Sequence, residues 1–199
     1  MQCREFLVNL SLPGCRPPFR GAIWREWVST TQDLPKIVSS QHLVSERSPE
    51  LSEFEFSLTV VNNAFHRWMV RCMSAAGEKD MTPTEVLLVH HVNHRGRQKK
   101  LADICFVLNM EDTHVVSYAL KKLVKMGYVA SEKSGKEVLF STTESGRQLC
   151  ERYRQVREQC LMSTLGDGGI ANPLIGDIAQ LMRTLAGVYD QAARAGASF

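Results

Sequence analysis

The chain has 199 residues, of which 44% are hydrophobic and 23% charged, and its formal net charge is +3. These values are close to those of ordinary globular proteins and exclude a disordered or collagen-like chain; no stretch approaches the roughly 18 apolar residues that a membrane helix needs. Asn9 and Ser11 interrupt the apolar stretch near the start, so we expect no export signal and a cytoplasmic protein. One domain with appendages fits this length.

Cysteine usage indicates a reducing compartment. No two cysteines form a C-x-x-C pair, and the gaps between them are long and uneven. A disulfide framework and a structural zinc site are therefore not expected, and we predict no metal and no cofactor. Four cysteines on apolar stripes are expected to be buried, inert thiols. They are Cys72, Cys105, Cys150 and Cys160.

The basic excess is concentrated in one segment. Residues 95–136 hold nine basic and four acidic residues, whereas the rest of the chain is nearly balanced. A localised basic patch is typical of a surface that binds a polyanion. On charge alone a solvated basic face explains the excess equally well, so the local pattern has to decide.

The first part of the chain combines a weakly organised segment with two helices. Several prolines interrupt residues 1–50, for which we expect a partly ordered extension. Apolar residues then recur every three or four positions and predict a long helix over 52–76. The next predicted helix, 83–93, starts with a capping box in which Thr82 is the N-cap and Glu85 lies three residues later.

Two further helices and a hairpin follow. Residues 98–108 and 111–126 each carry an apolar stripe of helical spacing. The second segment has acidic residues in its first turn and lysines near its end, as the helix dipole favours. The period then changes to two, which predicts strands over 128–131 and 138–141 joined by a polar tip.

The last part of the chain is predicted to be helical. A long helix capped by Thr142 or Thr143 should run to about residue 165, and residues 166–172 are typical of a flexible linker. A final helix is predicted over 173–193, where a heptad-like seam would bury against another helix. We predict a homodimer, with packing inside one chain as the alternative. The seam consists of Leu174, Ile178, Leu181, Leu185 and Val188.

Three short helices followed by a two-stranded hairpin is the order of a winged helix-turn-helix. The predicted fold class is mainly α, with a three-helix core, a two-stranded β-wing and flanking dimerisation helices. We expect an N-terminal extension at 1–50, a winged-helix DNA-binding domain at 51–165, and a linker with a C-terminal dimerisation helix at 166–199. An α-helix fits the major groove of B-DNA, where its side chains reach base edges.

The helix at 111–126 has the features of a recognition helix. Its outward stripe contains hydrogen-bonding and cationic side chains and no acid, whereas a solvated helix commonly mixes charges to gain ion pairs. Lys99 and Lys100 open the preceding helix, whose N-terminus would favour a phosphate, and Lys133 and Lys136 at the hairpin tip could enter a minor groove. The predicted DNA-binding set is Arg95, Arg97, Lys99, Lys100, His114, Ser117, Tyr118, Lys121, Lys122, Lys125, Lys133 and Lys136.

Three short motifs carry a family resemblance: Leu-Ala at 101–102, Leu-Val-Lys-Met-Gly-Tyr-Val at 123–129, and Thr-Glu-Ser-Gly at 143–146. With them, residues 82–150 resemble the multiple-antibiotic-resistance regulator (MarR) family of bacterial winged-helix repressors, and the flanking helices extend the resemblance over about 52–193. The resemblance implies a homodimer that binds a pseudo-palindromic site and is often released by a small aromatic ligand, a metal or an oxidant.

The hairpin tip departs from the pattern of that family. The family's wing usually carries an Asp-x-Arg pair whose arginine enters the minor groove, but here the tip reads Lys-Ser-Gly-Lys at 133–136. Lys133 or Lys136 would take the place of this arginine, although a lysine lacks the planar fork of a guanidinium group.

Residues that could sense a ligand are fewer. His90 and His94 lie one helical turn apart, as a metal pair would, but no carboxylate or cysteine completes a site at a recognisable spacing. We interpret them as structural or surface histidines. A second group of residues could line an effector pocket between the dimer and DNA lobes, with core packing as the alternative. These candidates are Phe65, Trp68, Met69 and Met73.

The sequence therefore predicts a DNA-binding transcriptional regulator, a repressor, that acts as a homodimer on a pseudo-palindromic operator. Its expected partners are double-stranded DNA, a second copy of the chain and a small aromatic effector, and no membrane. A winged-helix module that binds protein and not DNA is the alternative. An enzyme is not expected, because the sequence has no Gly-rich phosphate loop, nucleophile elbow or metal motif.

Overall fold

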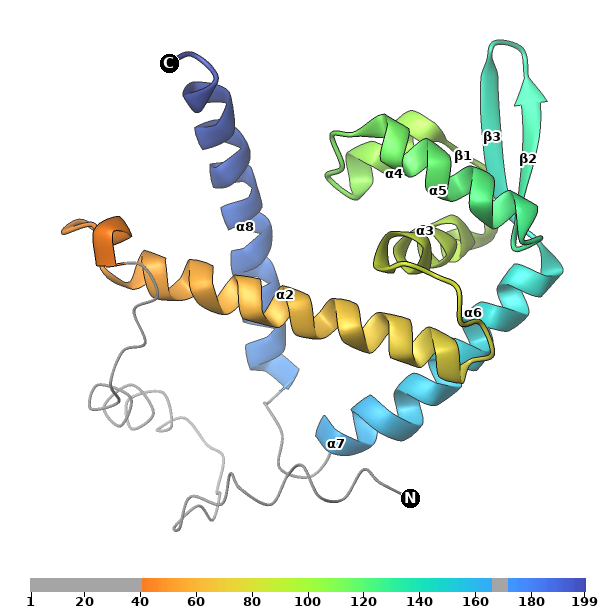
Figure 1. Cartoon of the computed structure of the whole chain (residues 1–199), viewed down its shortest axis with the longest axis horizontal. Helices are drawn as coiled ribbons and strands as arrows, with labels where there is room; N and C mark the ends of the chain where they lie inside the picture. Colours follow the sequence, from red (N-terminus) through yellow and green to blue (C-terminus); the bar gives the residue numbers. More distant parts are fainter. Residues whose placement is uncertain (1–40, 166–171) are drawn as a thin grey trace. The chain divides into compact units, whose positions relative to one another are not determined.

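Helices make up most of the structure, together with one small antiparallel sheet (Figure 1). The structure is a computed structural model that describes residues 41–165 and 172–199. Most of the expected extension and residues 166–171 of the linker predicted over 166–172 lie outside the described residues. The chain divides into the units Met1–Val60 and Val61–Phe199, and the predicted three-part division stays a prediction. Among the described helices, none combines the length and the apolar character needed to cross a membrane.

The described residues of the first unit form a short turn and the beginning of a long helix. The 3₁₀ turn η1 spans Gln41–Leu43, and helix α2 spans Glu50–Ala75 and continues into the second unit. The predicted helix over 52–76 is confirmed, with small shifts at both ends. Large apolar side chains on the first half of α2, such as Phe56 and Val60, are exposed.

Helix α3 (Pro83–Asn93) begins with the predicted capping box. The Glu85 amide donates to Thr82 Oγ1 at 3.3 Å, and the Thr82 amide donates to Glu85 Oε2 at 2.8 Å. Two N–H groups that a helix start leaves without partners are thereby bonded. A 3₁₀ turn, η2 (His94–Gly96), follows the helix.

The next segment differs from the predicted helix over 98–108. Lys99–Lys100 form strand β1, which pairs with strand β3 (Glu137–Thr142), and helix α4 spans only Leu101–Val107. The helical spacing of the apolar residues does not reveal this pairing, because the partner strand lies much later in the sequence.

Helix α5 (Thr113–Lys125) corresponds to the predicted recognition helix. The Oδ1 atom of Asp112 accepts hydrogen bonds from the amides of His114 at 2.9 Å and Val115 at 3.2 Å. Asp112 is therefore the N-cap and not a first-turn residue, so the helix starts later than predicted. Gly127 has a φ of +80° and ends the helix in the left-handed conformation that glycine tolerates best.

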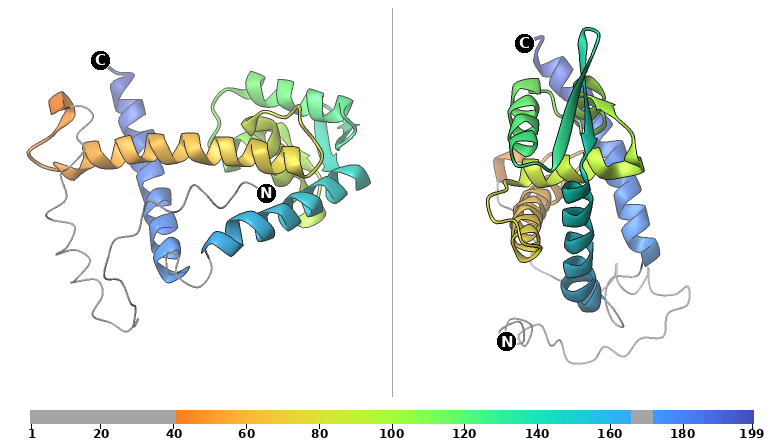
Figure 2. Two further views of the ribbon diagram at one scale, coloured as in Figure 1. Left: turned by 60° about the horizontal axis from the view of Figure 1, so that its bottom comes forward. Right: turned by 90° about the vertical axis from the view of Figure 1, so that its right-hand side faces the viewer.

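The predicted hairpin is confirmed and projects from the helices (Figure 2). Strand β2 (Val129–Ser134) pairs with β3, which lies between β1 and β2 in a three-stranded antiparallel sheet. Both strands are longer than predicted because the turn contains only Gly135 and Lys136, with Gly135 at a φ of +62°. Most of the expected polar tip is thus strand.

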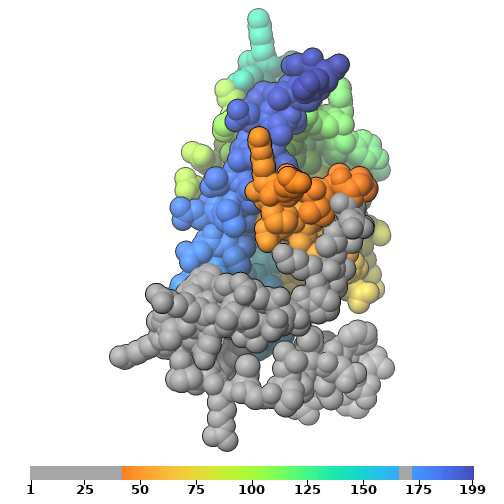
Figure 3. Space-filling view, turned by 90° about the vertical axis from the view of Figure 1, so that its left-hand side faces the viewer, coloured from red at the N-terminus to blue at the C-terminus, as the bar shows by residue number. Residues whose placement is uncertain are grey.

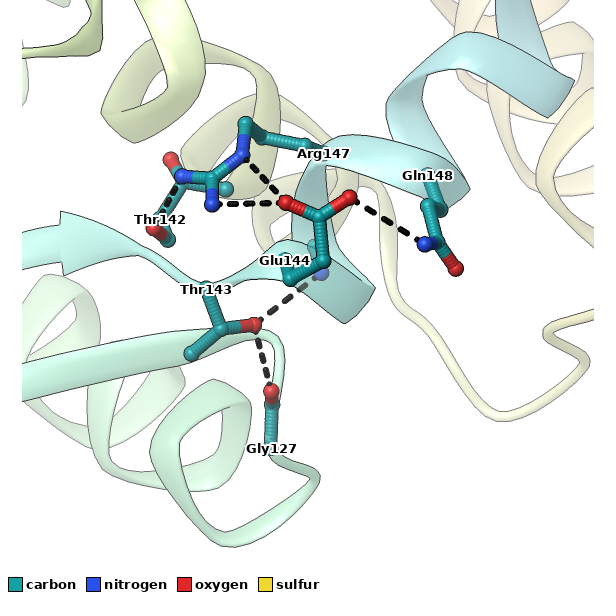
Figure 4. Close-up of polar contacts among 7 residues, drawn as sticks. Gly127, Thr142, Thr143, Glu144, Arg147 and Gln148 are labelled. Carbon is teal, nitrogen blue, oxygen red and sulfur yellow. Dashed lines mark hydrogen bonds and ion pairs between the residues drawn. The ribbon is translucent and has the colours of Figure 1, made fainter.

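Figure 4 shows how the hairpin passes into helix α6 (Glu144–Arg157). Thr143 Oγ1 accepts a hydrogen bond from the Gly146 amide at 3.0 Å and donates one to the Gly127 carbonyl at 2.7 Å. Gly146 lies so close to Tyr128 that a methyl group on its Cα would overlap the Tyr128 carbonyl oxygen. The Thr-x-x-Gly motif therefore provides both a helix cap and a close backbone approach.

The chain continues beyond α6 with a π-helical turn, η3 (Glu158–Met162), and the short helix α7 (Ser163–Leu165). Helix α8 (Asn172–Gly196) confirms the predicted last helix. Cys160 lies in the π-helical turn and is exposed, so the prediction of a buried thiol was wrong for this residue. A π-turn contains more residues than an α-turn and rotates the apolar stripe. The other three predicted thiols are buried: Cys72, Cys105 and Cys150.

One hydrophobic core joins the end of α2 to α3, α4, α5, the hairpin and α6. These helices with their small antiparallel sheet confirm the predicted winged-helix fold class. The core holds α5 by one face and leaves the opposite face to solvent. The largest fully buried side chains include Met73 of α2, Leu88 of α3, Ile104 of α4, Leu120 and Leu123 of α5, and Leu149 of α6.

Candidate nucleic-acid interface

Helix α5 has two chemically different faces. The inner face consists of the buried residues Val116, Ala119, Leu120 and Leu123. The outer face consists of the exposed residues His114, Tyr118, Lys121 and Lys125. No acidic side chain lies on α5 itself, and Tyr118 is 74% exposed. The outer face is thus free to meet a ligand of negative charge.

The start of α5 does not offer a bare helix N-terminus. Asp112 Oδ1 already accepts the amides of His114 and Val115, and its carboxylate adds negative charge there. A phosphate would meet this carboxylate, so contacts with DNA are better placed on the later turns. Tyr118 and Lys121 lie on those turns.

Lys122 does not lie where the sequence predicted. It was expected on the outer face, but its Nζ donates to the Asp80 carbonyl at 2.6 Å and to Glu85 Oε2 at 2.9 Å. Glu85 is only 3% exposed, so the Lys122 ammonium binds a buried carboxylate and does not lie free on the outer face of α5. Successive helix residues are about 100° apart, which places Lys122 on the flank of α5 near the start of α3.

Lys99 is a second correction to the predicted set. Its side chain is 7% exposed, and its Nζ donates to the carbonyls of Val92 at 2.9 Å and His94 at 2.7 Å. These carbonyls belong to the end of α3, which a helix leaves without internal partners. Successive strand residues face opposite sides, and strand β1 directs Lys99 inward. Burial, followed by the nearby charges of Arg97 and Arg95, lowers the pKa of Lys99.

Lys100 faces outward, but it has an acidic neighbour. Its Nζ lies 2.7 Å from Glu137 Oε2 on β3, and this hydrogen-bonded contact raises the pKa of Lys100. Both side chains are about half exposed, so the pair adds little stability and can open when a phosphate approaches. Beside it, Gln98 Nε2 donates to Glu132 Oε2 on β2 at 2.8 Å.

The cations of the loop and the wing are exposed as predicted. Arg95 and Arg97 follow α3, and Arg95 has a φ of +64°. Lys133 lies on β2 and Lys136 in the turn of the hairpin. In the space-filling view of Figure 3 the hairpin tip stands out as a narrow projection, a shape that suits insertion into a groove.

A pocket of about 530 Å³ lies between α5, the start of α4 and the hairpin. Ser117 and Lys121 border it from α5, and Leu101 and Phe140 contribute apolar surface from α4 and β3. Ser117 is half-buried, whereas Lys121 is exposed. Two residues of the predicted DNA-binding set therefore lie at the edge of a hollow.

The four candidate effector residues differ widely in exposure. Met69 and Met73 are buried in the core, and Trp68 packs against it, whereas Phe65 is exposed. A ligand could reach the two methionines only if the core opened. Core packing, the alternative interpretation, therefore describes Met69 and Met73, and an effector role for the set stays a prediction.

His90 packs against the core. Its ring packs edge-on against Tyr153 with centroids 4.4 Å apart, its Nε2 is buried without a hydrogen-bond partner, and burial lowers its pKa. His94 is exposed at the end of α3. Within the described ranges, no group of three or more His, Cys, Asp or Glu side chains could hold a metal ion.

Two residues that bear on the site were not anticipated. Val115 is 47% exposed in the first turn of α5, where it adds an apolar side chain beside Tyr118; its position between the two stripes was the available signal. Glu85 was recognised only as a helix cap, although it also binds Lys122. No local pattern indicates that contact, because its partners lie on different helices.

Comparison with known proteins supports the assignment of this region. Residues 81–146 match the family model of the winged helix DNA-binding domain. This segment contains α3, α4, α5 and the hairpin, so a winged helix DNA-binding domain lies here. No curated protein sequence matches the chain.

Solved structures extend the comparison beyond this segment. A MarR-family transcriptional regulator from Rhodococcus sp. RHA1 has 14% identity and a TM-score of 0.57, covering 74% of this chain and 96% of that one. A MarR mutant from E. coli in complex with operator DNA has 21% identity and a TM-score of 0.54, covering 72% and 99%. CouR from Rhodococcus jostii RHA1, bound to p-coumaroyl-CoA, has 13% identity and a TM-score of 0.57, covering 67% and 91%. The chain thus has the fold of MarR-type winged-helix proteins, as the sequence resemblance predicted.

Proposed function

We propose that this chain, which has a MarR-type winged-helix fold, is a cytoplasmic transcriptional repressor that binds a pseudo-palindromic operator as a homodimer. The observation that carries the proposal is the exposed face of α5, which is cationic and hydrogen-bonding and contains no acid, on a helix anchored by its other face. Such a helix fits the major groove. The matched winged helix DNA-binding domain supports the same conclusion. An enzymatic activity is not part of the proposal.

In the proposed complex α5 lies in the major groove and the hairpin reaches the neighbouring minor groove. Side chains on the middle turns of α5 contact base edges and adjoining phosphates, while the loop and wing cations contact the backbone. Lys99 and Lys122 leave the predicted set because their ammonium groups are bonded within the protein. The proposed DNA-contacting residues are Arg95, Arg97, Lys100, His114, Ser117, Tyr118, Lys121, Lys125, Lys133 and Lys136.

A second copy of the chain is the proposed partner of α8. No residue of α8 is buried, and Ile178, Leu181 and Val188 of its heptad-like seam are exposed. A seam of this kind packs against another helix. Twofold symmetry would bring two α5 helices to successive major grooves roughly 34 Å apart, which is why a pseudo-palindromic operator is proposed.

Release from DNA by a small aromatic effector is a further part of the proposal. CouR, which shares the fold, was solved with p-coumaroyl-CoA bound to it. In this chain Phe65 is exposed and Trp68 half-buried, so these two members of the predicted effector set remain accessible to a ligand.

A winged-helix module that binds another protein is the second candidate function. Phe106 and Val107 at the end of α4 favour it, because Phe106 is 86% exposed and both are apolar. The acid-free face of α5 favours DNA, since an apolar protein partner would not require it.

A mobility-shift titration separates the two candidates. The probes are the duplex upstream of the protein's own coding sequence and a random-sequence duplex of equal length. We expect a discrete complex with the first probe at lower protein concentration, weakened by salt because phosphate contacts release counterions. Equal affinity for both probes would contradict sequence-specific repression, and no binding to either would favour the protein-binding module.

A further inference from the structure

Two adjacent lysines of α5 have different environments. Lys121 is exposed and borders the pocket beside the hairpin. Lys122 is half-buried and reaches the start of α3. Because the two residues differ by one step around the helix, they offer a comparison in which position along α5 is nearly constant and only the direction of the side chain changes.

Glu85 is the main partner of Lys122. Its Oε2 accepts the Thr82 amide at 2.8 Å and the Lys122 ammonium at 2.9 Å. A buried carboxylate depends on such donors, because its charge is unfavourable away from water. Glu85 is only 3% exposed, so we expect it to hold Lys122 more firmly than a carboxylate in a surface ion pair would.

The same ammonium also binds the loop between α2 and α3 through the Asp80 carbonyl, at 2.6 Å. Two other contacts hold this loop: Tyr128 Oη donates to Glu78 Oε2 at 2.8 Å, and Arg152 Nε donates to the Ala76 carbonyl at 2.8 Å. Tyr128 follows α5 and Arg152 lies on α6. Of these three contacts, the one made by Lys122 comes from a residue within α5 itself.

We propose that Lys122 is a positioning residue that fixes α5 against the start of α3 through Glu85 and the Asp80 carbonyl, without contacting DNA. The inference rests on the proposed function, because it concerns how α5 meets a duplex. Reading base edges requires accurate placement of the helix, whereas the salt dependence of binding counts the phosphates that cations neutralise. Loss of Lys122 should therefore reduce discrimination between sequences and leave the salt dependence unchanged.

The test uses the full chain with the variants Lys122→Met, Lys122→Arg and Glu85→Gln, and Lys121→Met as the matched control. Affinity is measured over a range of salt concentrations for a duplex that the wild-type protein selects from a randomised library, and for a random-sequence duplex. We expect Lys122→Met and Glu85→Gln to weaken binding of the selected duplex about tenfold, the scale of one lost base contact. Binding of the random duplex and the salt slope should stay as in the wild type.

The control variants separate positioning from phosphate contact. Lys121→Met should reduce the salt slope by about 0.9, as expected for one lost phosphate contact, and Lys122→Arg, which keeps charge and donors, should restore most of the discrimination. Should Lys122→Met fail to fold in thermal unfolding, Glu85→Gln decides, because buried Glu85 cannot touch DNA. A reduced salt slope in Lys122→Met, or wild-type discrimination in a folded Glu85→Gln protein, overturns the positioning role alone. A wild-type protein that selects no duplex overturns the proposed function and the positioning role with it.

Discussion

Helices α5 and α8 both carry apolar residues at helical spacing, but only α5 buries them within the chain. Leu120 and Leu123 of α5 are fully buried, whereas Leu181 of α8 is 52% exposed and no residue of α8 is buried. The DNA-binding domain of one copy is therefore complete, while α8 presents an apolar face to solvent. The spacing of apolar residues shows that a helix is amphipathic. It does not show whether the apolar face packs within the same chain or against another one.

The largest expected effect comes from truncating the buried face of α5. Leu120→Ala removes a fully buried side chain and leaves a cavity, so we expect a loss of about 2–5 kcal/mol in the free energy of unfolding. Denaturant titration followed by circular dichroism measures it. A loss well below this range would show that α5 is not anchored by the core.

A methyl group added to a glycine should have opposite effects in the domain and on α8. In Gly146→Ala the new methyl would overlap the Tyr128 carbonyl oxygen, and we expect a destabilisation of about 1–3 kcal/mol. The matched control is Gly187→Ala on α8, where the new methyl meets nothing within 4 Å beyond the adjoining backbone of the helix itself. This variant should be neutral or stabilising by up to about 1 kcal/mol. Thermal unfolding of both variants measures the two changes in stability. Equal changes in the two variants would contradict the prediction.

Mild acid should weaken the domain and spare α8. Burial lowers the pKa of His90 from 6.5. Below about pH 6.5, His90 therefore becomes protonated in the unfolded chain while it stays neutral in the folded chain. Stability is fully present above that pH and falls as the pH drops through the folded-state pKa. His90→Phe keeps a ring beside Tyr153 and removes this titration, so its melting temperature should vary less between pH 7 and about 5. An unchanged pH dependence would contradict the role of His90. Helix α8 contains no histidine, so no titration of this kind is expected there.

The smallest effect on unfolding is expected on α8. Leu181→Ser should change the stability of the dilute, unassociated chain by less than about 0.5 kcal/mol, because the side chain is exposed. It should nevertheless weaken self-association, measured by sedimentation velocity over a range of concentrations. Wild-type association in this variant would assign the dimer to another surface.

Features with a local signal were predictable from the sequence. The capping box of Thr82 and Glu85 is visible in four residues, and Gly127 ends α5 where the helical period stops. Strand β1 was missed because its partner strand comes much later in the chain. Cys160 was misplaced because a π-turn, which no simple pattern indicates, alters the phase of the helix.

The basic residues of the candidate site look alike in the sequence, and their neighbours decide what each can do. Lys99 donates hydrogen bonds to carbonyl groups at the end of α3, and Lys122 donates one to Glu85. Both lysines thus bind groups on other elements. Lys121 and Lys125 have the same chemistry but lie on the exposed face of α5. The sequence located the charged region, and only the fold distinguishes cations directed inward from those directed outward.

The turn of the hairpin, a glycine followed by Lys136, has a consequence for how a genome could use this protein. An ammonium group on a flexible chain responds to electrostatic potential more than to the outline of a base pair. Bases beneath the wing would then be free to drift during evolution, while those beneath α5 stay constrained. We expect the binding sites to share short conserved half-sites and to differ at their outer edges, so that promoters with unrelated flanks could come under the control of a single regulator.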